Sequence, residues 1–96
     1  MKFTWDIKKA RKVFSERRIS FDKISDVFED SFSLDLIDEK HSTPDEIRFI
    51  IVGKTAEYGL IHLVYTMPND DEIHIITARR AGKWFIEQYE KNVRRT

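Results

Sequence analysis

The sequence lacks cysteine altogether, and it has only three glycines and two prolines among 96 residues. Without thiol groups, the chain can form neither a disulfide framework nor a thiolate metal site. The glycines Gly53, Gly59 and Gly82 stand too far apart to build a phosphate-cradling loop. No spacing of histidines and carboxylates matches a known zinc or calcium site, so we expect no metal and no cofactor.

Long apolar runs are absent as well. Runs such as "FIIV" at 49–52 fall far short of the roughly 20 apolar residues that a membrane helix needs. The N-terminal stretch "MKFTWDIKKAR" has no apolar core of the kind found in signal peptides. We therefore expect a soluble, cytoplasmic protein in which residues 1–96 form one small domain.

Charge is segregated along the chain although the formal net charge is zero. Residues 1–18 carry a net charge of +5 and residues 73–96 a net charge of +4, whereas 19–46 carry −7 and 47–72 carry −2. If the two ends meet in the fold, a basic surface would attract a polyanion, and an acidic surface would attract a basic partner. Solvated faces with ordinary salt bridges would give the same pattern.

Hydrophobic periodicity predicts two helices after a short strand at 3–5. Asp6 is a plausible N-cap for the first helix, which carries apolar residues at helical spacing up to Phe14. Ser20 is a plausible N-cap for the second helix, in which Phe21, Ile24, Val27 and Phe28 form one apolar stripe.

Alternating apolar residues then predict a run of four strands. We expect these strands from Phe32, over 47–53, over 60–66 and over 72–77, with Gly59 in a turn. Thr77 is expected to cap a closing helix that contains Ala78, Ala81, Phe85 and Tyr89 on one face. The order favours an α+β fold: an antiparallel β-sheet meander with two N-terminal helices and one C-terminal helix.

Several stretches, taken in their order, carry a resemblance to a known family. They are "FTWDIKK", "ISFDKISDVFED", "HSTPDEIRFIIVG" and "IHIITARRA". The matching positions in them, together with a later tyrosine, are Trp5, Asp6, Lys9, His41, Glu46, Arg48, Gly53, Arg79, Ala81 and Tyr89. In these positions the chain resembles the BrnT family, ribonuclease toxins of type II toxin–antitoxin systems with a RelE-like fold.

The resemblance implies a metal-independent endoribonuclease that inhibits translation and is neutralised by a cognate antitoxin. In the family this partner is a BrnA-like protein with a ribbon-helix-helix fold. DNA is then contacted only through the antitoxin complex, which would be a heterotetramer, and the toxin alone may form a homodimer. No membrane partner is implied.

RNA cleavage without a metal requires a base for the 2′-hydroxyl, a cation for the phosphate oxygens, and an acid for the departing 5′-oxygen. Arginine suits the second role, because its planar guanidinium binds phosphate through two hydrogen bonds and stays charged. The candidate cations are Arg48 and Arg79. For the acid and the base, the matching positions offer His41, Glu46 and Tyr89, and the other positions offer His62 and His74.

Each candidate also has a plain structural interpretation. For His62 and His74, which sit in apolar strands, the alternative is an ordinary half-buried histidine, and for His41 it is a solvated side chain in an acidic loop. Glu46 and Arg48 are two residues apart, and their alternative is a surface ion pair. The alternative for Tyr89 is packing of the last helix onto the sheet.

A second group of cations is suited to contact the RNA backbone. It consists of Lys8, Lys9, Lys12, Arg80 and Lys83. These residues would form one phosphate-binding surface if the first and last helices packed side by side. Stacking on aromatic residues is a weaker expectation, because Trp5 and Trp84 are the only indoles and Trp5 is expected in the core.

Three departures from the family pattern support an alternative function. Arg17 stands within a stretch where the family usually has Lys-His-Gly, Pro68 lies where an arginine is frequent, and Phe85 replaces a common glutamate. A toxin-derived binding module that has lost cleavage, but still acts in a DNA-binding repressor complex, would show such changes. An unrelated α+β interaction domain is the third possibility.

Overall fold

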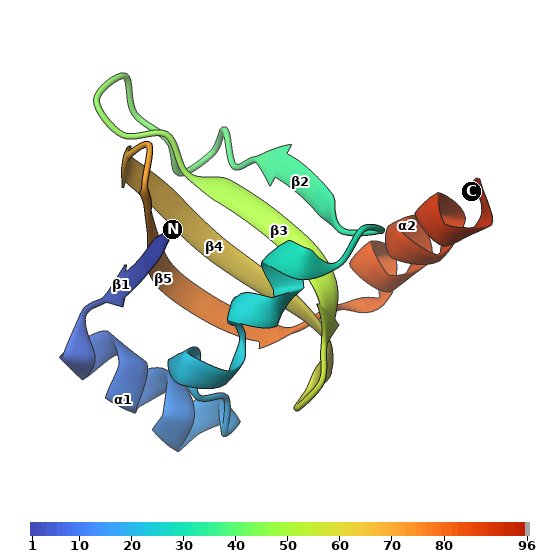
Figure 1. Cartoon of the computed structure of the whole chain (residues 1–96), viewed down its shortest axis with the longest axis horizontal. Helices are drawn as coiled ribbons and strands as arrows, with labels where there is room; N and C mark the ends of the chain where they lie inside the picture. Colours follow the sequence, from blue (N-terminus) through green and yellow to red (C-terminus); the bar gives the residue numbers. More distant parts are fainter. Residues whose placement is uncertain (96) are drawn as a thin grey trace.

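The structure is a computed structural model that describes residues 1–95 (Figure 1). Thr96, the last residue of the expected domain, lies outside the described residues. The elements are β1 (Lys2–Trp5), α1 (Ile7–Arg17), the 3-10 helices η1 (Phe21–Lys23) and η2 (Ser25–Glu29), β2 (Leu34–Ile37), β3 (Phe49–Thr55), β4 (Gly59–Asn69), β5 (Glu72–Arg80) and α2 (Lys83–Arg94). Within residues 1–95, no helix is long and apolar enough to span a bilayer.

The described residues form an α+β fold around one five-stranded sheet, in the order β1-β5-β4-β3-β2. Strands β2 to β5 form the antiparallel meander that the sequence predicts. The expectation of a wholly antiparallel sheet is wrong, because β1 pairs in parallel with β5, from Lys2 opposite Glu72 to Trp5 opposite Ile75. This pairing covers the outer edge of β5 and lets Phe3 and Trp5 pack against the core.

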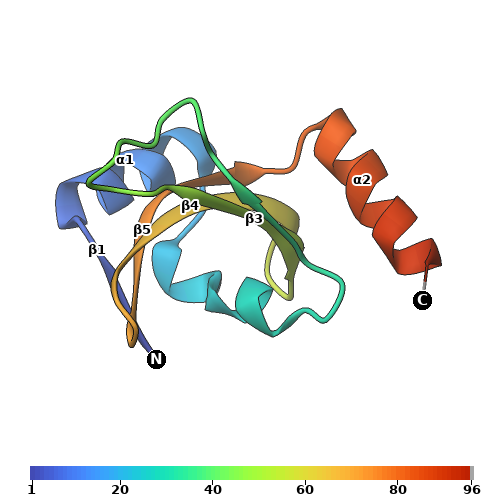
Figure 2. The same ribbon diagram turned by 90° about the horizontal axis from the view of Figure 1, so that it is seen from above.

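The hydrophobic core lies on one face of the sheet. Ile51, Ile61, Leu63 and Ile75 point to this face and are fully buried. Figure 2 shows η1 and η2 on this side and the loop before β3 on the opposite side. The opposite face is therefore only partly covered, and α1 and α2 lie at its two ends in both views (Figures 1 and 2).

The first predicted helix is confirmed, including its cap. The Asp6 carboxylate accepts hydrogen bonds from the backbone N–H groups of Lys8 (2.8 Å) and Lys9 (3.1 Å). Arg18 ends the helix in a left-handed conformation with φ of 59°. This conformation is the one that glycine favours after a helix.

The second predicted helix is not an α-helix. It consists of η1 and η2, which are separated at Ile24. The buried side chains Phe21, Ile24 and Val27 are spaced by three residues, which matches the three residues per turn of a 3-10 helix. The Ser20 hydroxyl also binds the Asp22 carboxylate instead of capping the helix.

The predicted start of the closing helix at Thr77 is wrong. Strand β5 continues through Arg80, and α2 begins at Lys83 after Gly82. The reason is the length of β4, whose residues 61–64 pair with residues 77–80. Ala78 is buried in the core of the sheet instead of lying on a helix.

Gly53 marks the closest approach between the sheet and η2. A Cβ at this position would lie 2.5 Å from Val27 Cγ2 and 3.1 Å from the Val27 carbonyl oxygen. We expect Gly53→Ala to lower the free energy of unfolding by about 1–3 kcal/mol, because the packed segment must shift. Denaturant unfolding of Gly53→Ala, Val27→Ala and the double variant tests this. Strictly additive losses in the double variant would contradict the proposed clash.

Candidate active site

A cleft of about 400 Å³ opens on the sheet face that lies opposite the core. Its floor contains Ile50, Val64 and Thr77, which are neighbours on three adjacent strands. Arginines and histidines from separate parts of the chain surround this floor. The cleft therefore combines an apolar base with a basic rim.

Strand β5 carries Arg79 into this cleft. His62 on β4 lies directly opposite Arg79, and Val64 lies opposite Thr77. The register then shifts, since Tyr65 pairs with Ile75 and Ile76 is left as the extra residue of a β-bulge. A bulge bends its strand and increases the local twist, and bulges are frequent beside active sites. If the register of Tyr65 with Ile75 continued without this shift, Arg79 would lie opposite Ile61 and point to the core face.

The end of α1 supplies a second cation. The Arg17 Nη1 atom donates hydrogen bonds to Thr77 Oγ1 (3.1 Å) and to the Ala78 carbonyl oxygen (3.0 Å). These contacts fix the guanidinium against the strand that bears Arg79. The left-handed turn at Arg18 then leads the chain away from the cleft.

The loop between β2 and β3 supplies His41 together with a carboxylate. The Asp38 carboxylate is 2.9 Å from Nδ1 of His41, whose side chain is 59% exposed. Ser42 closes the loop, because its hydroxyl donates to the Asp38 carbonyl oxygen (2.7 Å) and accepts from the Arg48 backbone N–H (2.9 Å). A carboxylate on Nδ1 fixes the ring orientation and leaves Nε2 available. His41 is thus held by the loop, although it is largely exposed.

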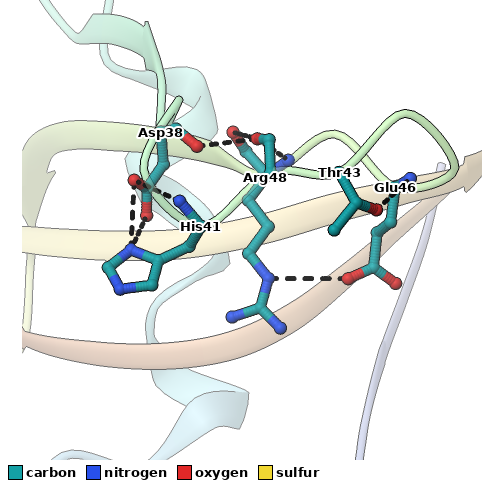
Figure 3. A network of polar contacts seen from close by, with 6 residues as sticks. Asp38, His41, Thr43, Glu46 and Arg48 are labelled. Atoms are coloured by element: carbon teal, nitrogen blue, oxygen red, sulfur yellow. Dashed lines mark hydrogen bonds and ion pairs between the residues drawn. The ribbon is translucent and has the colours of Figure 1, made fainter.

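Arg48, at the end of the same loop, is the third cation. In Figure 3 its side chain and that of His41 point to the same side of the loop, and Glu46 lies beyond Arg48. The Arg48 Nε atom is 3.5 Å from the Glu46 carboxylate and is buried without a hydrogen-bond partner in residues 1–95. The ion pair between Glu46 and Arg48 is therefore present, and Glu46 itself does not line the cleft.

His62 lies within the cleft and is 7% exposed. Burial lowers its pKa below the usual value of 6.5, and the positive charge of Arg79 lowers it further. Its Nδ1 atom is buried and has no hydrogen-bond partner among the described residues. The ring of Phe85 packs edge-on against the imidazole, with a centroid distance of 4.6 Å. Burial and the guanidinium of Arg79 thus both favour the neutral form of His62.

Tyr89 lies elsewhere. It is buried, and its hydroxyl donates to the Asp30 carboxylate at 2.7 Å, which ties α2 to the segment that follows η2. Burial and this hydrogen bond raise the pKa of Tyr89 to about 12. His74 is also outside the cleft, because its Nδ1 atom is 2.8 Å from the Thr4 hydroxyl on β1.

The structure does not gather the five cations expected to bind the RNA backbone. Lys8, Lys9 and Lys12 are exposed on α1, and Lys83 is exposed at the start of α2, at the other end of the sheet. Arg80 points away from Arg79: it donates to the Arg17 carbonyl oxygen (3.0 Å) and lies over the Tyr58 ring. The condition that the first and last helices pack side by side is not met.

Sequence reasoning singled out Arg48, Arg79 and His41, and the structure brings these three side chains to one cleft. It did not name Asp38, and it treated Arg17 and Phe85 only as departures from a family pattern. All three line the same cleft.

Residues 5–84 match the model of the ribonuclease toxin BrnT of type II toxin–antitoxin systems. The chain belongs to the BrnT family. A comparison with curated proteins finds no match. As a BrnT ribonuclease toxin of a type II system, the chain has a cognate antitoxin as its partner.

The match to BrnT covers β1 in part, α1 and all of β2 to β5, so every arginine of the cleft lies within it. It ends at Trp84, which leaves nearly all of α2 outside. Phe85, the aromatic wall of the cleft, is the first residue beyond the match. This BrnT toxin therefore closes its cleft with a residue that lies outside the matched range.

The contact between Tyr89 and Asp30 predicts a dependence of stability on pH. Burial alone would raise the pKa of Asp30, but hydrogen bonds from Tyr89 and from two backbone N–H groups outweigh it and lower this pKa below 3.8. The stability due to Asp30 is present above its unfolded pKa and is lost as the pH falls through the lowered value. The stability due to Tyr89 is lost as the pH rises from 10 towards 12.

We therefore expect Tyr89→Phe to lower the free energy of unfolding by about 1 kcal/mol at neutral pH, because a charged acceptor loses its donor. Denaturant unfolding at several pH values should show that the difference in free energy of unfolding between wild type and variant becomes smaller at acidic and at alkaline pH. In an Asp30→Asn background, Tyr89→Phe should lower the free energy of unfolding by less. An equal loss in both backgrounds would show that the hydrogen bond to Asp30 does not cause the loss of stability.

Proposed function

We propose that the cleft lined by Arg17, Arg48 and Arg79 is the ribonuclease active site and that it cleaves RNA without a metal. The observation that supports this is the convergence of three guanidiniums from α1, the β2–β3 loop and β5. Like charges repel, so such a cluster favours a bound anion. A phosphodiester fits a cleft of about 400 Å³ and can accept two hydrogen bonds from each guanidinium.

The proposed reaction is attack of the 2′-hydroxyl on the adjacent phosphorus. A base removes the hydroxyl proton as the bond from the 2′-oxygen to phosphorus forms, and an acid protonates the 5′-oxygen as its bond to phosphorus breaks. The products are a 2′,3′-cyclic phosphate and a free 5′-hydroxyl. Arg48 and Arg79 stabilise the extra negative charge that develops on the phosphate oxygens. Arg17 orients the same group from the third side.

The two histidines of the cleft suit opposite roles in this reaction. Burial and Arg79 keep His62 neutral, so it can accept the proton of the 2′-hydroxyl. His41 is held through Nδ1 by Asp38, so its Nε2 can donate a proton to the 5′-oxygen. We assign Glu46 to the positioning of Arg48, and Tyr89 to the attachment of α2, instead of catalysis.

RNA on either side of the scissile phosphate requires further cations. We propose that Lys8, Lys9 and Lys12 on α1 contact phosphates on one side, and that Lys83 contacts phosphates on the other. The two groups of contacts are separate in space, because α1 and α2 lie at opposite ends of the sheet (Figures 1 and 2). Arg80 is left out of this set, since it is bound to Arg17 and Tyr58.

The family suggests the wider role. We propose that residues 1–96 form a single RelE-like domain that acts in the cytoplasm, inhibits translation and is neutralised by a BrnA-like ribbon-helix-helix antitoxin. Toxin and antitoxin would form a heterotetramer that contacts DNA through the antitoxin alone. The alternative, a binding module without cleavage, is favoured by the placement of Arg17 and Phe85 in the cleft, where the family usually has other side chains.

Expression of the toxin alone should arrest growth, and Arg79→Ala should relieve the arrest. We expect the variant to cleave RNA roughly 10²–10³-fold more slowly, because one donor to the transition state is lost. Arg79→Lys should recover only part of this rate, since lysine keeps the charge but loses the planar fork. The measurement is cleavage of purified RNA, together with growth after induction.

Arg94→Ala is a matched control, because it removes one exposed positive charge from α2 at a residue that does not line the cleft. This variant should cleave RNA and arrest growth as the wild-type toxin does. If wild-type expression is harmless and the purified protein leaves RNA intact, the active-site proposal fails and the binding module remains.

Asp38→Asn tests the orientation of His41. We expect cleavage to slow by about tenfold or more, but by less than the roughly 10²–10⁴-fold cost of removing a proton donor in His41→Ala. Asp45→Asn, an exposed carboxylate of the same loop, is the control and should keep the wild-type rate. An unchanged cleavage rate in Asp38→Asn would leave Asp38 without a catalytic role.

A further inference from the structure

A second concave surface lies between α1 and η1 and has a volume of about 380 Å³. We call this surface the α1 groove. One of its walls is the helical stripe Ile7, Ala10, Arg11 and Phe14, and the other begins at Ser20. These α1 positions follow the i, i+3, i+4, i+7 spacing of a single helix face. The groove thus runs along α1, on a surface that the cleft does not include.

The walls of the α1 groove leave large apolar side chains in contact with solvent. Ile7 is 62% exposed and Phe14 is 46% exposed. Trp5 and Phe21 extend the apolar surface inward, and their rings pack edge-on at 6.1 Å. A contiguous apolar surface of this kind on a small soluble protein indicates a contact with another protein.

The α1 side of the groove is strongly basic, whereas the η1 side carries one carboxylate, Asp22, which binds the Ser20 hydroxyl. Arg11 lines it, and the guanidinium of Arg18 lies 5.6 Å from the centroid of the Phe14 ring. The other exposed cations of the same helix are Lys8, Lys9 and Lys12. Glu16 is the one carboxylate among residues 7–18. An occupant that complements this surface must be apolar at its centre and acidic along the margin that faces α1.

We propose that the α1 groove is the docking site of the cognate antitoxin, through an acidic amphipathic segment whose apolar side chains pack between Ile7 and Phe14. The inference rests on the proposed neutralisation of RNA cleavage by that partner. RNA complements the cations but not the exposed isoleucine and phenylalanine. A second copy of the chain would bring a like-charged helix onto this one, at an electrostatic cost.

The position of the α1 groove relates docking to inhibition. Arg17, the last residue of α1, borders the helical stripe that lines the groove, and its guanidinium lines the cleft. A segment that follows α1 from Ile7 to Phe14 therefore arrives at the mouth of the cleft. The antitoxin would bind in the groove and block the cleft beyond Arg17, where it competes with RNA for the α1 lysines.

The test uses the full toxin and the purified cognate antitoxin, with affinity measured by calorimetry and RNA cleavage measured in parallel. We expect Ile7→Asp and Phe14→Glu each to weaken antitoxin binding by about tenfold or more, because an apolar contact is replaced by a repulsive charge. Both variants should still cleave RNA and arrest growth, and co-expressed antitoxin should no longer relieve the arrest. An acidic residue in the first turn of a helix is favourable, so Ile7→Asp should fold even if Phe14→Glu does not.

Arg11→Glu tests the charge requirement and should also weaken antitoxin binding. Met67→Glu, an equally exposed apolar residue on the β4–β5 hairpin, is the matched control and should bind normally. Unchanged affinity of the Ile7 and Phe14 variants would overturn the proposal. The proposal would also be overturned if these variants lost RNA binding, or changed the oligomeric state of the toxin alone, while their affinity for the antitoxin stayed the same. An inactive wild-type toxin would instead contradict the proposed ribonuclease function, whereas antitoxin binding would still be measurable.

Discussion

The pairing of β4 with β5 is the constraint on which the candidate site depends. Because β4 is long, β5 continues to Arg80, past the point at which Thr77 could have started a helix. The bulge at Ile76 then sets which residues face the cleft, and Arg79 faces it while Arg80 is bound on the other side. Two adjacent arginines therefore have different surroundings. Neither arginine lies at the start of a helix, where a cation is unfavourable, since α2 begins only at Lys83.

The contacts that hold the guanidiniums of the cleft leave most of their positive charge without a negative partner. Arg17 donates to a hydroxyl and a carbonyl oxygen, which carry no net charge, and Arg48 has one partly exposed carboxylate partner. No ion pair reaches Arg79 within residues 1–95. The lowered pKa of His62 reflects the same positive environment, after the larger effect of its own burial. A site of this kind is prepared for an anion before the anion arrives, which lowers the cost of reorganisation.

Local patterns in the sequence predicted the elements whose structure is decided locally. The Asp6 cap, the turn at Gly59, with φ of +72°, and the antiparallel run from β2 to β5 are confirmed. The errors concern long-range pairing, because neither the parallel contact of β1 with β5 nor the extension of β5 is visible in a short window. The three-residue spacing of Phe21, Ile24 and Val27 did indicate a 3-10 helix, but it was interpreted as part of an α-helical stripe. The assignment of Arg48, Arg79 and His41 to catalysis stays a prediction, and Asp38 had no sequence signal because its role depends on the shape of its loop.

The parallel pairing of β1 with β5 has a consequence during synthesis. Lys2 to Trp5 leave the ribosome well before their partners, Glu72 to Ile75, which are 70 residues further along the chain. The cleft itself draws on side chains from Arg17 to Phe85. A nascent chain therefore has no assembled cleft until Phe85 has been made, and the proposed cleavage of RNA cannot begin before then. At roughly 5–20 residues per second, an antitoxin that binds α1 as proposed would have several seconds to meet this helix before the cleft is complete.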